Sequence, residues 1–256
     1  MLKRAIVRPP SENFGEGLTT AQLGLPDYSR AVVQHDAYCA ALEKCGLELV
    51  RLEADPRFPD STFVEDTAVI TEKSAILTRP GAPSRTDEVE SIKPVLALYP
   101  MDIHEIQPPG TLDGGDVCEA GNHFLIGISA RTNEAGGDQL AKVLSSYGYT
   151  SSVVDIRGVD SLLHLKSGLA YLGDDRLVVI EALANRPEFS DYNLVRVMSG
   201  EEYSANCVRI NDLVLLAKGY STLKRRLREL RYEMVELDMT EFQRMDGGLS
   251  CLSLRF

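Results

Sequence analysis

Long apolar runs and an excess of positive charge are both absent from this sequence of 256 residues. No segment approaches the roughly 20 consecutive apolar residues that a membrane-spanning helix requires. Residues 1–10 contain no apolar stretch of the kind found in secretory signal peptides. The formal net charge is −11, whereas nucleic-acid phosphates would require a basic face. We therefore expect a cytoplasmic protein that binds neither membrane nor nucleic acid, with a surface that suits a small cationic ligand.

Cysteine and histidine are also scarce. The chain has five cysteines, an odd number, and no two of them are spaced as C-x-x-C. Neither a disulfide framework nor a structural zinc site is therefore expected. The four histidines stand at no metal-ligand spacing from one another or from a cysteine, so the sequence predicts no metal site. We expect His35 on a helix surface and His123 in a hairpin turn.

No low-complexity tract and no linker interrupts the chain. The hydrophobic fraction is 44% and the charged fraction is 25%, both close to the average for globular proteins. The chain is long for one average domain, but single domains of this size are common among barrel-like and propeller-like folds. We therefore predict one domain over residues 1–256.

Four pairs of short β-branched or apolar segments recur along the chain, and turn-forming residues split each pair. The turns recur about every 45 residues, and a fixed period of this size indicates a closed array rather than one continuous sheet. The pairs are Thr67–Ile70 with Ala75–Thr78, Asp116–Glu119 with Phe124–Gly127, Gly168–Leu172 with Leu177–Ile180, and Cys207–Ile210 with Val214–Ala217.

Helices and further strands between the hairpins complete the repeated unit. Apolar residues at helical spacing predict three helices, and a short apolar strand follows each helix. The helices are Pro26–Cys45, Asn133–Tyr147 and Ser221–Leu230, and the strands are Glu48–Leu52, Ser152–Ile156 and Glu233–Leu237. A fifth hairpin would join residues 251–256 to residues 4–8. This hairpin would close the ring and protect its edges.

The segments that precede the hairpins carry acidic residues and paired glycines, as in Leu112–Asp116 and Asp246–Cys251. In a ring, these segments gather at one end. A lone histidine in an apolar segment is more often a core residue, but a cysteine beside a histidine and a carboxylate is typical of an activated nucleophile. Several carboxylates in one pocket favour a cation, and a guanidinium pairs with them bidentately. The residues expected to converge are Asp60, Asp66, Asp113, His164 and Cys251.

Four separated motifs carry a family resemblance, and the similarity runs the length of the chain from Glu16–Thr20 onward. The motifs are Phe63–Asp66, Leu112–Asp116, Leu163–Leu172 and Asp246–Cys251. Together they resemble the dimethylarginine dimethylaminohydrolases of the guanidino-group-modifying, or pentein, superfamily. The resemblance implies an α/β fold, a five-bladed α/β-propeller of repeated ββαβ units around a central active-site cavity. It further implies a homodimer.

The implied activity is the hydrolysis of Nω-methylated arginine to citrulline and methylamine or dimethylamine, through a covalent cysteine thiouronium and without a metal or organic cofactor. Cys251 matches the nucleophile, His164 the general acid and base, and Asp113 the acidic residue beside the histidine. Asp66 matches the carboxylate that grips the guanidinium. The other substrate-binding matches are Asp60 and Glu65 in the pocket, Arg85 and Arg131 for the substrate carboxylate, and the backbone carbonyls of Leu18 and Met245 for the α-amine.

Two other functions fit the same residues. A deiminase or hydrolase of another guanidino or ureido amino acid, such as arginine or citrulline, would use the same cysteine, histidine and carboxylates. A non-catalytic protein that binds arginine-like ligands is the weaker alternative, because a pure binder needs no nucleophile and Cys251, His164 and Asp113 are all present. A citrulline-formation assay distinguishes these functions.

Overall fold

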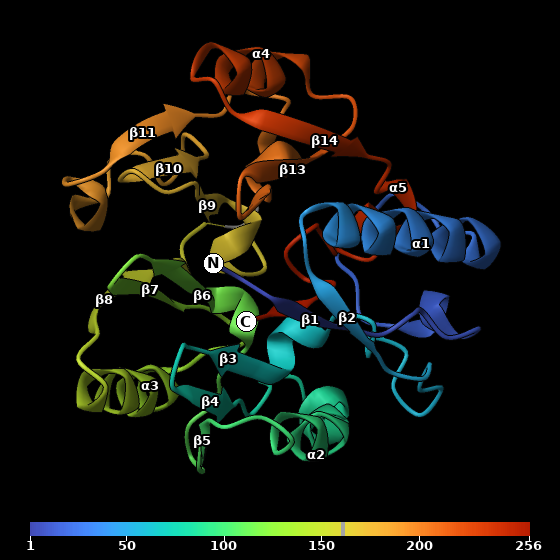
Figure 1. The fold of residues 1–256 in the computed structure, drawn as a ribbon, viewed down its shortest axis with the longest axis vertical. Helices are drawn as coiled ribbons and strands as arrows, with labels where there is room; N and C mark the ends of the chain where they lie inside the picture. The colour runs from blue at the N-terminus through green and yellow to red at the C-terminus, as the bar shows by residue number, and fades with distance from the viewer. Residues whose placement is uncertain (160–161) are drawn as a thin grey trace.

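Five small sheets of three strands each form a ring around a central axis (Figure 1). The computed structural model describes residues 1–159 and 162–256. In every sheet the inner strand runs antiparallel to the middle strand, and the outer strand runs parallel to it. Parallel neighbours need a long crossover connection, so each outer strand follows a helical segment on the rim. The predicted α/β-propeller of five blades is confirmed.

Four of the five sheets are continuous in sequence, and each contains one of the predicted hairpins. Their strands, from the inside outward, are β3 (Ala68–Ile70), β4 (Ser74–Leu77) and β5 (Asp102–Glu105); β6 (Val117–Ala120), β7 (His123–Ile128) and β8 (Thr150–Asp155); β9 (Leu169–Tyr171), β10 (Arg176–Val179) and β11 (Asn193–Arg196); and β12 (Val208–Ile210), β13 (Leu213–Ala217) and β14 (Glu233–Leu237).

The fifth sheet joins the two ends of the chain, as predicted. Its strands are β15 (Leu254–Arg255), β1 (Arg4–Val7) and β2 (Glu48–Arg51). Ala5 lies opposite Arg255, and the Phe256 carbonyl accepts hydrogen bonds from the Arg4 and Lys3 amides. Both termini therefore lie near the axis (Figure 1), and the last strand closes the ring.

The longer helices lie on the rim of the propeller (Figure 1). Asp27 caps the first, accepting from the Arg30 amide at 3.0 Å, and Asn133 caps another, accepting from the Gly136 amide at 2.8 Å. An Asp or Asn side chain at this position satisfies a backbone amide that the helix itself leaves unpaired. The helices are α1 (Tyr28–Lys44), α2 (Lys93–Leu96), α3 (Glu134–Ser146), α4 (Ser221–Glu229) and α5 (Thr240–Gln243). The three predicted helices are α1, α3 and α4.

The sequence does not predict the helical segments of two crossovers, because proline divides these crossovers into short turns. Between β4 and β5 the chain forms a 3₁₀ helix, Pro83–Ser91, and then α2. Each of these helices has a proline at its first or second position. Between β10 and β11 it forms only the 3₁₀ turn Pro187–Phe189. Proline fits the first helical turn but ends any helix that precedes it, so neither crossover shows a long apolar period.

A single 3₁₀ turn precedes the inner strand of each continuous sheet. The turns are Val64–Thr67, Gly114–Asp116, Leu165–Ser167 and Glu202–Ala205. The turns pack closely, since a Cβ atom at Gly114 would lie 2.0 Å from the Glu65 carbonyl oxygen. At Gly115 it would lie 2.8 Å from the His164 ring. The paired glycines therefore serve close packing at the centre of the ring.

The expectation for His35 is wrong. This side chain is 2% exposed, because the face of α1 that carries it is buried where α1 packs against the sheet of β15, β1 and β2. Its Nδ1 atom lies 3.7 Å from Cys39 Sγ, and its Nε2 atom is buried with no hydrogen-bond partner in the described part of the chain. Burial lowers the pKa of His35 to about 4.

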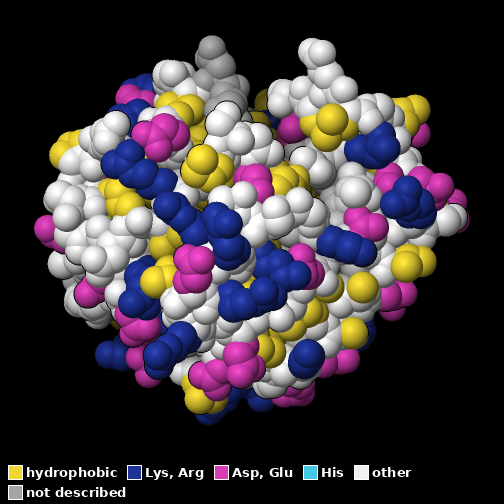
Figure 2. Space-filling view, turned by 90° about the horizontal axis from the view of Figure 1, so that it is seen from above, with side chains coloured by type: hydrophobic (Ala, Val, Ile, Leu, Met, Phe, Trp, Pro, Cys, Tyr) yellow, Lys and Arg dark blue, Asp and Glu magenta, His cyan; other side chains and the backbone are white. Residues whose placement is uncertain are grey.

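The cysteines behave as predicted, because all five are free and four of them are buried. Only Cys251 is partly exposed. No helix in residues 1–159 or 162–256 is long and apolar enough to cross a bilayer. Charge is unevenly distributed on the surface. Basic side chains gather on the rim over α4 (Figure 2), and α4 itself contains Lys224, Arg225, Arg226 and Arg228.

Candidate active site

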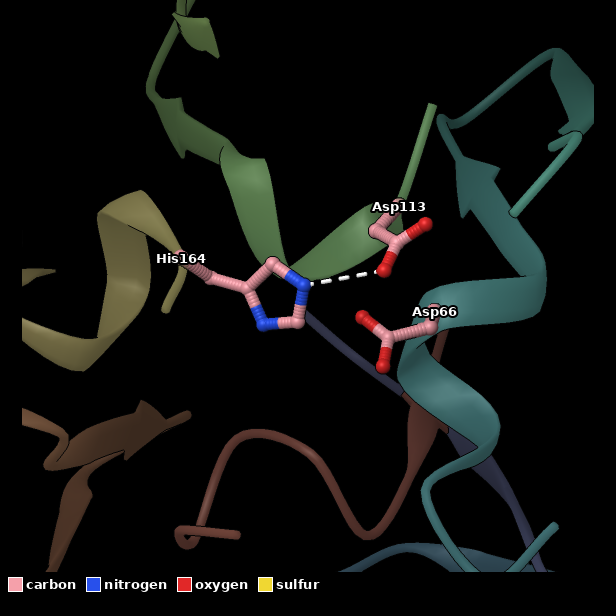
Figure 3. Close-up of side chains that lie close together, drawn as sticks. All are labelled: Asp66, Asp113 and His164. Carbon is pink, nitrogen blue, oxygen red and sulfur yellow. Dashed lines mark hydrogen bonds and ion pairs between the residues drawn. The ribbon is translucent and has the colours of Figure 1, made fainter. Parts of the chain in front are cut away.

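Three of the predicted residues meet at the axis, each carried by a different turn. His164 stands just before one 3₁₀ turn, Asp113 just before another, and Asp66 within a third (Figure 3). His164 Nε2 lies 2.9 Å from Asp113 Oδ2. The other Asp113 oxygen accepts a hydrogen bond from the Gly81 amide at 2.8 Å. Both Asp113 oxygens are therefore bonded, one to the imidazole and the other to the backbone.

Asp66 is held as a carboxylate. Its Oδ1 atom accepts from the Gly115 amide at 2.9 Å, and its Oδ2 atom accepts from Arg85 Nη1 at 2.6 Å. Burial by itself would raise the pKa of Asp66. The positive charges of His164 and Arg85 outweigh burial and lower that pKa to about 2.

His164 is held as an imidazolium. Burial by itself would lower its pKa, but the carboxylates of Asp66, Asp116 and Asp113 outweigh burial and raise the pKa of His164 to about 9. Asp116 is itself fully buried and accepts three hydrogen bonds. A histidine protonated at neutral pH can donate a proton to a leaving group.

Cys251 is protonated in the absence of a ligand. Burial, followed by the negative charges of Glu65 and Asp66, raises the pKa of its thiol to about 12. The Gly248 amide donates to Sγ at 3.4 Å and partly offsets this effect. A cation placed beside the sulfur would favour the thiolate, which is the reactive form.

Cys251 and His164 line one cavity. It is about 20 Å³ in volume, which is room for about one water molecule. Eight of the ten predicted residues line it, and Asp113 is fully buried and hydrogen-bonded to His164. The lining consists of Leu18, Asp60, Phe63, Asp66, Arg85, Arg131, Leu163, His164, Met245, Asp246, Gly247 and Cys251. An amino acid the size of arginine requires this cavity to open.

Glu65 does not line the cavity. Its carboxylate pairs with Lys166 at 2.6 Å and Arg255 at 3.1 Å, and accepts from Ser250 Oγ at 2.7 Å. It lines a separate and larger cavity of about 200 Å³ that does not include Cys251. The ion pairs with Lys166 and Arg255 and the hydrogen bond from Ser250 turn Glu65 away from the site, so its predicted contact with substrate has no support in this geometry.

The two predicted arginines differ in how far they are committed to other residues. The buried Arg85 guanidinium donates to Asp66 and Glu88 and to the carbonyls of Asp60 and Phe63. The Arg131 side chain is partly exposed and forms no hydrogen bond or ion pair with the described residues. Arg131 is therefore the freer cation of the two for an anionic group.

Leu18 brings the segment of residues 17–20 to the edge of the cavity, which it lines. The Leu18 amide donates to both oxygens of Asp60 at 3.1 Å. Thr20 donates to the Asp246 carboxylate through its amide and, at 3.0 Å, through its hydroxyl. Within the part of the chain that the structure describes, no hydrogen bond ends on the backbone carbonyls of Leu18 or Met245. These carbonyls remain free to accept from a ligand.

Comparison with known proteins places this site in a family. The sequence model of the arginine deiminase family matches residues 54–198. The chain is 42% identical to the N(G),N(G)-dimethylarginine dimethylaminohydrolase of Pseudomonas aeruginosa, over 100% of both chains. It is 34% identical to the protein of the same name from Streptomyces coelicolor, over 99% of this chain and 96% of the relative.

The chain belongs to the dimethylarginine dimethylaminohydrolase family.

Solved structures of this dimethylarginine dimethylaminohydrolase family agree with the fold. A cysteine-to-serine variant of the Pseudomonas aeruginosa protein, complexed with citrulline, superposes with a TM-score of 0.97 at 42% identity, over 100% of both chains. The N-terminal domain of ArgZ, a cyanobacterial arginine dihydrolase, matches with a TM-score of 0.88 at 19% identity, over 98% of this chain and 96% of that domain. At that identity the second match shows the shared fold alone.

Four further residues line the cavity, although the sequence did not predict them as site residues. They are Phe63, Leu163, Asp246 and Gly247. All four stand inside the motifs that carry the resemblance, within two positions of an assigned residue. A signal was thus present, but sequence could not separate the side chains that face the cavity from those that face the core.

Proposed function

We propose that the chain hydrolyses Nω-methylated arginines to citrulline and methylamine or dimethylamine, by covalent catalysis at Cys251. One observation carries the proposal: a protonated His164, a carboxylate at Asp66 and the Cys251 thiol all line one buried cavity. The full-length similarity to two dimethylarginine dimethylaminohydrolases supports the substrate class. The reaction needs no metal or organic cofactor.

The cavity offers a partner for each end of a methylated arginine. The Asp66 carboxylate pairs with the guanidinium, and Asp60 adds a second negative group. Arg131 receives the substrate carboxylate. The free carbonyls of Leu18 and Met245 accept from the α-amine. The segment of residues 17–20 opens to admit the substrate and then excludes water.

The first half of the reaction begins when the bound guanidinium lowers the pKa of the Cys251 thiol and the thiol releases its proton to solvent water. The thiolate attacks the central carbon, forming a carbon–sulfur bond. The imidazolium of His164 protonates the methylated nitrogen, and the carbon–nitrogen bond breaks. A neutral amine therefore departs, which is far easier than expelling an amide anion. The product on the enzyme is a cysteine thiouronium.

The second half uses the imidazole that the first half left neutral. His164 removes a proton from water, and the oxygen attacks the thiouronium carbon. The tetrahedral intermediate collapses with cleavage of the carbon–sulfur bond. The hydroxyl proton passes to the departing sulfur, which restores the thiol and releases citrulline. His164 returns to its protonated state and is ready for the next substrate.

An assay of citrulline formation compares monomethylarginine, asymmetric dimethylarginine and unmethylated arginine. We expect both methylated substrates to give citrulline and an amine in equal amounts. A preference for unmethylated arginine would identify an arginine hydrolase on the same fold. Binding without turnover of any of the three would identify the protein as a binding module instead.

The same proposal includes a cytoplasmic location and a homodimer, both of which stay predictions. Sedimentation of the purified chain measures its oligomeric state, and a mass of one chain would contradict the homodimer. Cell fractionation tests the cytoplasmic location.

A further inference from the structure

We infer that Asn206 is a positioning residue that sets Cys251 and His164 at their working separation. This inference rests on the proposed function and extends it to a side chain outside the reactive groups. Asn206 ends the 3₁₀ turn that precedes β12, and it is 6% exposed. It does not line the cavity that holds Cys251.

Asn206 bonds to the segment that carries the nucleophile. Its Oδ1 atom accepts from the Ser250 amide at 2.9 Å, and its Nδ2 atom donates to Ser250 Oγ at 3.0 Å. A Cβ atom at Gly248 would lie 2.4 Å from Asn206 Oδ1, so this segment rests directly on the amide. Ser250 directly precedes Cys251 in sequence. The Gly248 amide is the group that donates to the Cys251 sulfur.

Asn206 also bonds to the segment that carries the histidine. Its Nδ2 atom donates to the Lys166 carbonyl at 2.8 Å, within the 3₁₀ turn that His164 begins. One amide group therefore joins the two catalytic segments, which come from different blades and are 87 positions apart in sequence. An amide is suited to this task because it donates and accepts at the same time.

A second connection runs in parallel through Glu65. Ser250 Oγ donates to Glu65 at 2.7 Å, and Lys166 pairs with Glu65 at 2.6 Å. Ser250 and Lys166 are thus tied together twice, once by Asn206 and once by Glu65. The Glu65 connection keeps the segments near each other when Asn206 is replaced, while the finer placement of sulfur against imidazole is lost.

The consequence for the reaction is selective. Turnover requires Cys251 and His164 to act on one carbon–nitrogen bond, so it depends on their relative placement, and a displacement of about 1 Å can cost roughly 100-fold in rate. Alkylation of Cys251 by iodoacetamide requires the sulfur alone. Loss of Asn206 should therefore reduce turnover much more than alkylation.

The test compares Asn206→Ala with Asn211→Gly. Asn211 also makes three side-chain hydrogen bonds, to Leu2 and Cys45, and it lies in the turn between β12 and β13. Glycine accommodates its φ of 51°. We expect Asn206→Ala to lower kcat by about 10- to 100-fold with KM within about twofold, and to change the iodoacetamide rate by less than about threefold. Asn211→Gly should keep kcat within about twofold at a similar loss of Tm.

Equal kcat values for Asn206→Ala and Asn211→Gly would overturn the positioning role. So would an equal fall in turnover and alkylation. If Asn206→Ala does not fold, Asn206→Ser serves as the second variant, because its hydroxyl is too short to bond both segments. A wild-type chain that makes no citrulline would reject the proposed function, which is a different outcome from an active wild type with an unaffected variant.

Discussion

At the scale of single residues, the site is a set of charges whose protonation states are decided by their neighbours. Three acidic side chains surround His164 and keep it protonated, while burial keeps Cys251 neutral. The two groups therefore start in states in which neither reacts alone. The positive charge that makes the thiol reactive has to arrive with the ligand, which couples reactivity to binding.

The pH dependence of Cys251 alkylation tests this arrangement. Without substrate, the rate with iodoacetamide should rise about tenfold per pH unit from pH 7 to pH 10, because the pKa of the thiol is about 12 and the thiolate is the reacting species. Peptide mapping identifies which cysteine is alkylated, and Cys251→Ser should show no labelling at position 251. A plateau below pH 9 would mean that the thiol ionises without a cation.

The arginines also invite a test at this scale. Replacing Arg131 by alanine should raise KM by about 10- to 100-fold with little change in kcat, because a charge-assisted hydrogen bond to the substrate carboxylate is lost far from the reacting carbon. Steady-state kinetics measure both constants. Arg225→Ala, on the exposed face of α4, is the matched control. An unchanged KM in Arg131→Ala would remove this residue from substrate binding.

At the scale of elements, the segment of residues 17–20 is attached to Asp60 on one side and to Arg244 and Asp246 on the other. Asp60 holds the Leu18 amide and is buried, whereas Asp246 is partly exposed. Asp246 holds Thr19 and Thr20 from the segment that leads to Cys251. In the proposed function the segment opens for substrate, and opening would break its contacts with Asp246.

Asp246→Gly tests the attachment. Glycine keeps the φ of 57° and removes the carboxylate. We expect the Thr20 amide to exchange its hydrogen at least about tenfold faster, and KM to rise about tenfold, because a looser segment must be ordered on binding. Asp175→Gly, at a φ of 53° in the turn between β9 and β10, is the control. Unaltered exchange at Thr20 would show that Asp246 does not hold the segment.

At the scale of the whole molecule, stability is spread around a closed ring in which buried titratable groups respond to pH. His35 is the clearest case, since its folded-state pKa is about 4, whereas an unfolded histidine titrates near 6.5. Between these values the unfolded chain binds the proton and the folded chain does not. This difference makes folding less favourable as the pH falls from about 6.5 to about 4.

His35→Gln should remove this term. We expect the stability of the wild type to fall relative to the variant by about 3 kcal/mol between pH 7 and pH 4. Urea unfolding at several pH values measures the difference, which also cancels the opposing contributions of buried carboxylates. His104→Gln, at a partly exposed position on β5, is the control. A constant difference across the pH range would show that His35 does not titrate on unfolding.

The sequence by itself determined the repeated unit and predicted the candidate reactive residues. Apolar hairpins recur at a nearly constant period, and pairing within each hairpin is local, so the chain specifies it without reference to distant segments. The composite sheet of β15 and β1 also followed, because an open ring would leave two exposed edges. Cys251, His164 and Asp66 stand in motifs that precede these hairpins.

Only the tertiary structure decided which way several of these side chains face. Glu65 and Asp66 are neighbours in sequence, yet Asp66 lines the cavity and Glu65 pairs with Lys166 and Arg255 on the other side. Asn206 stands 45 positions before Cys251 and carried no distinguishing pattern. The physical reason is common to both: direction and hydrogen-bond partners depend on contacts between blades, which no local period encodes.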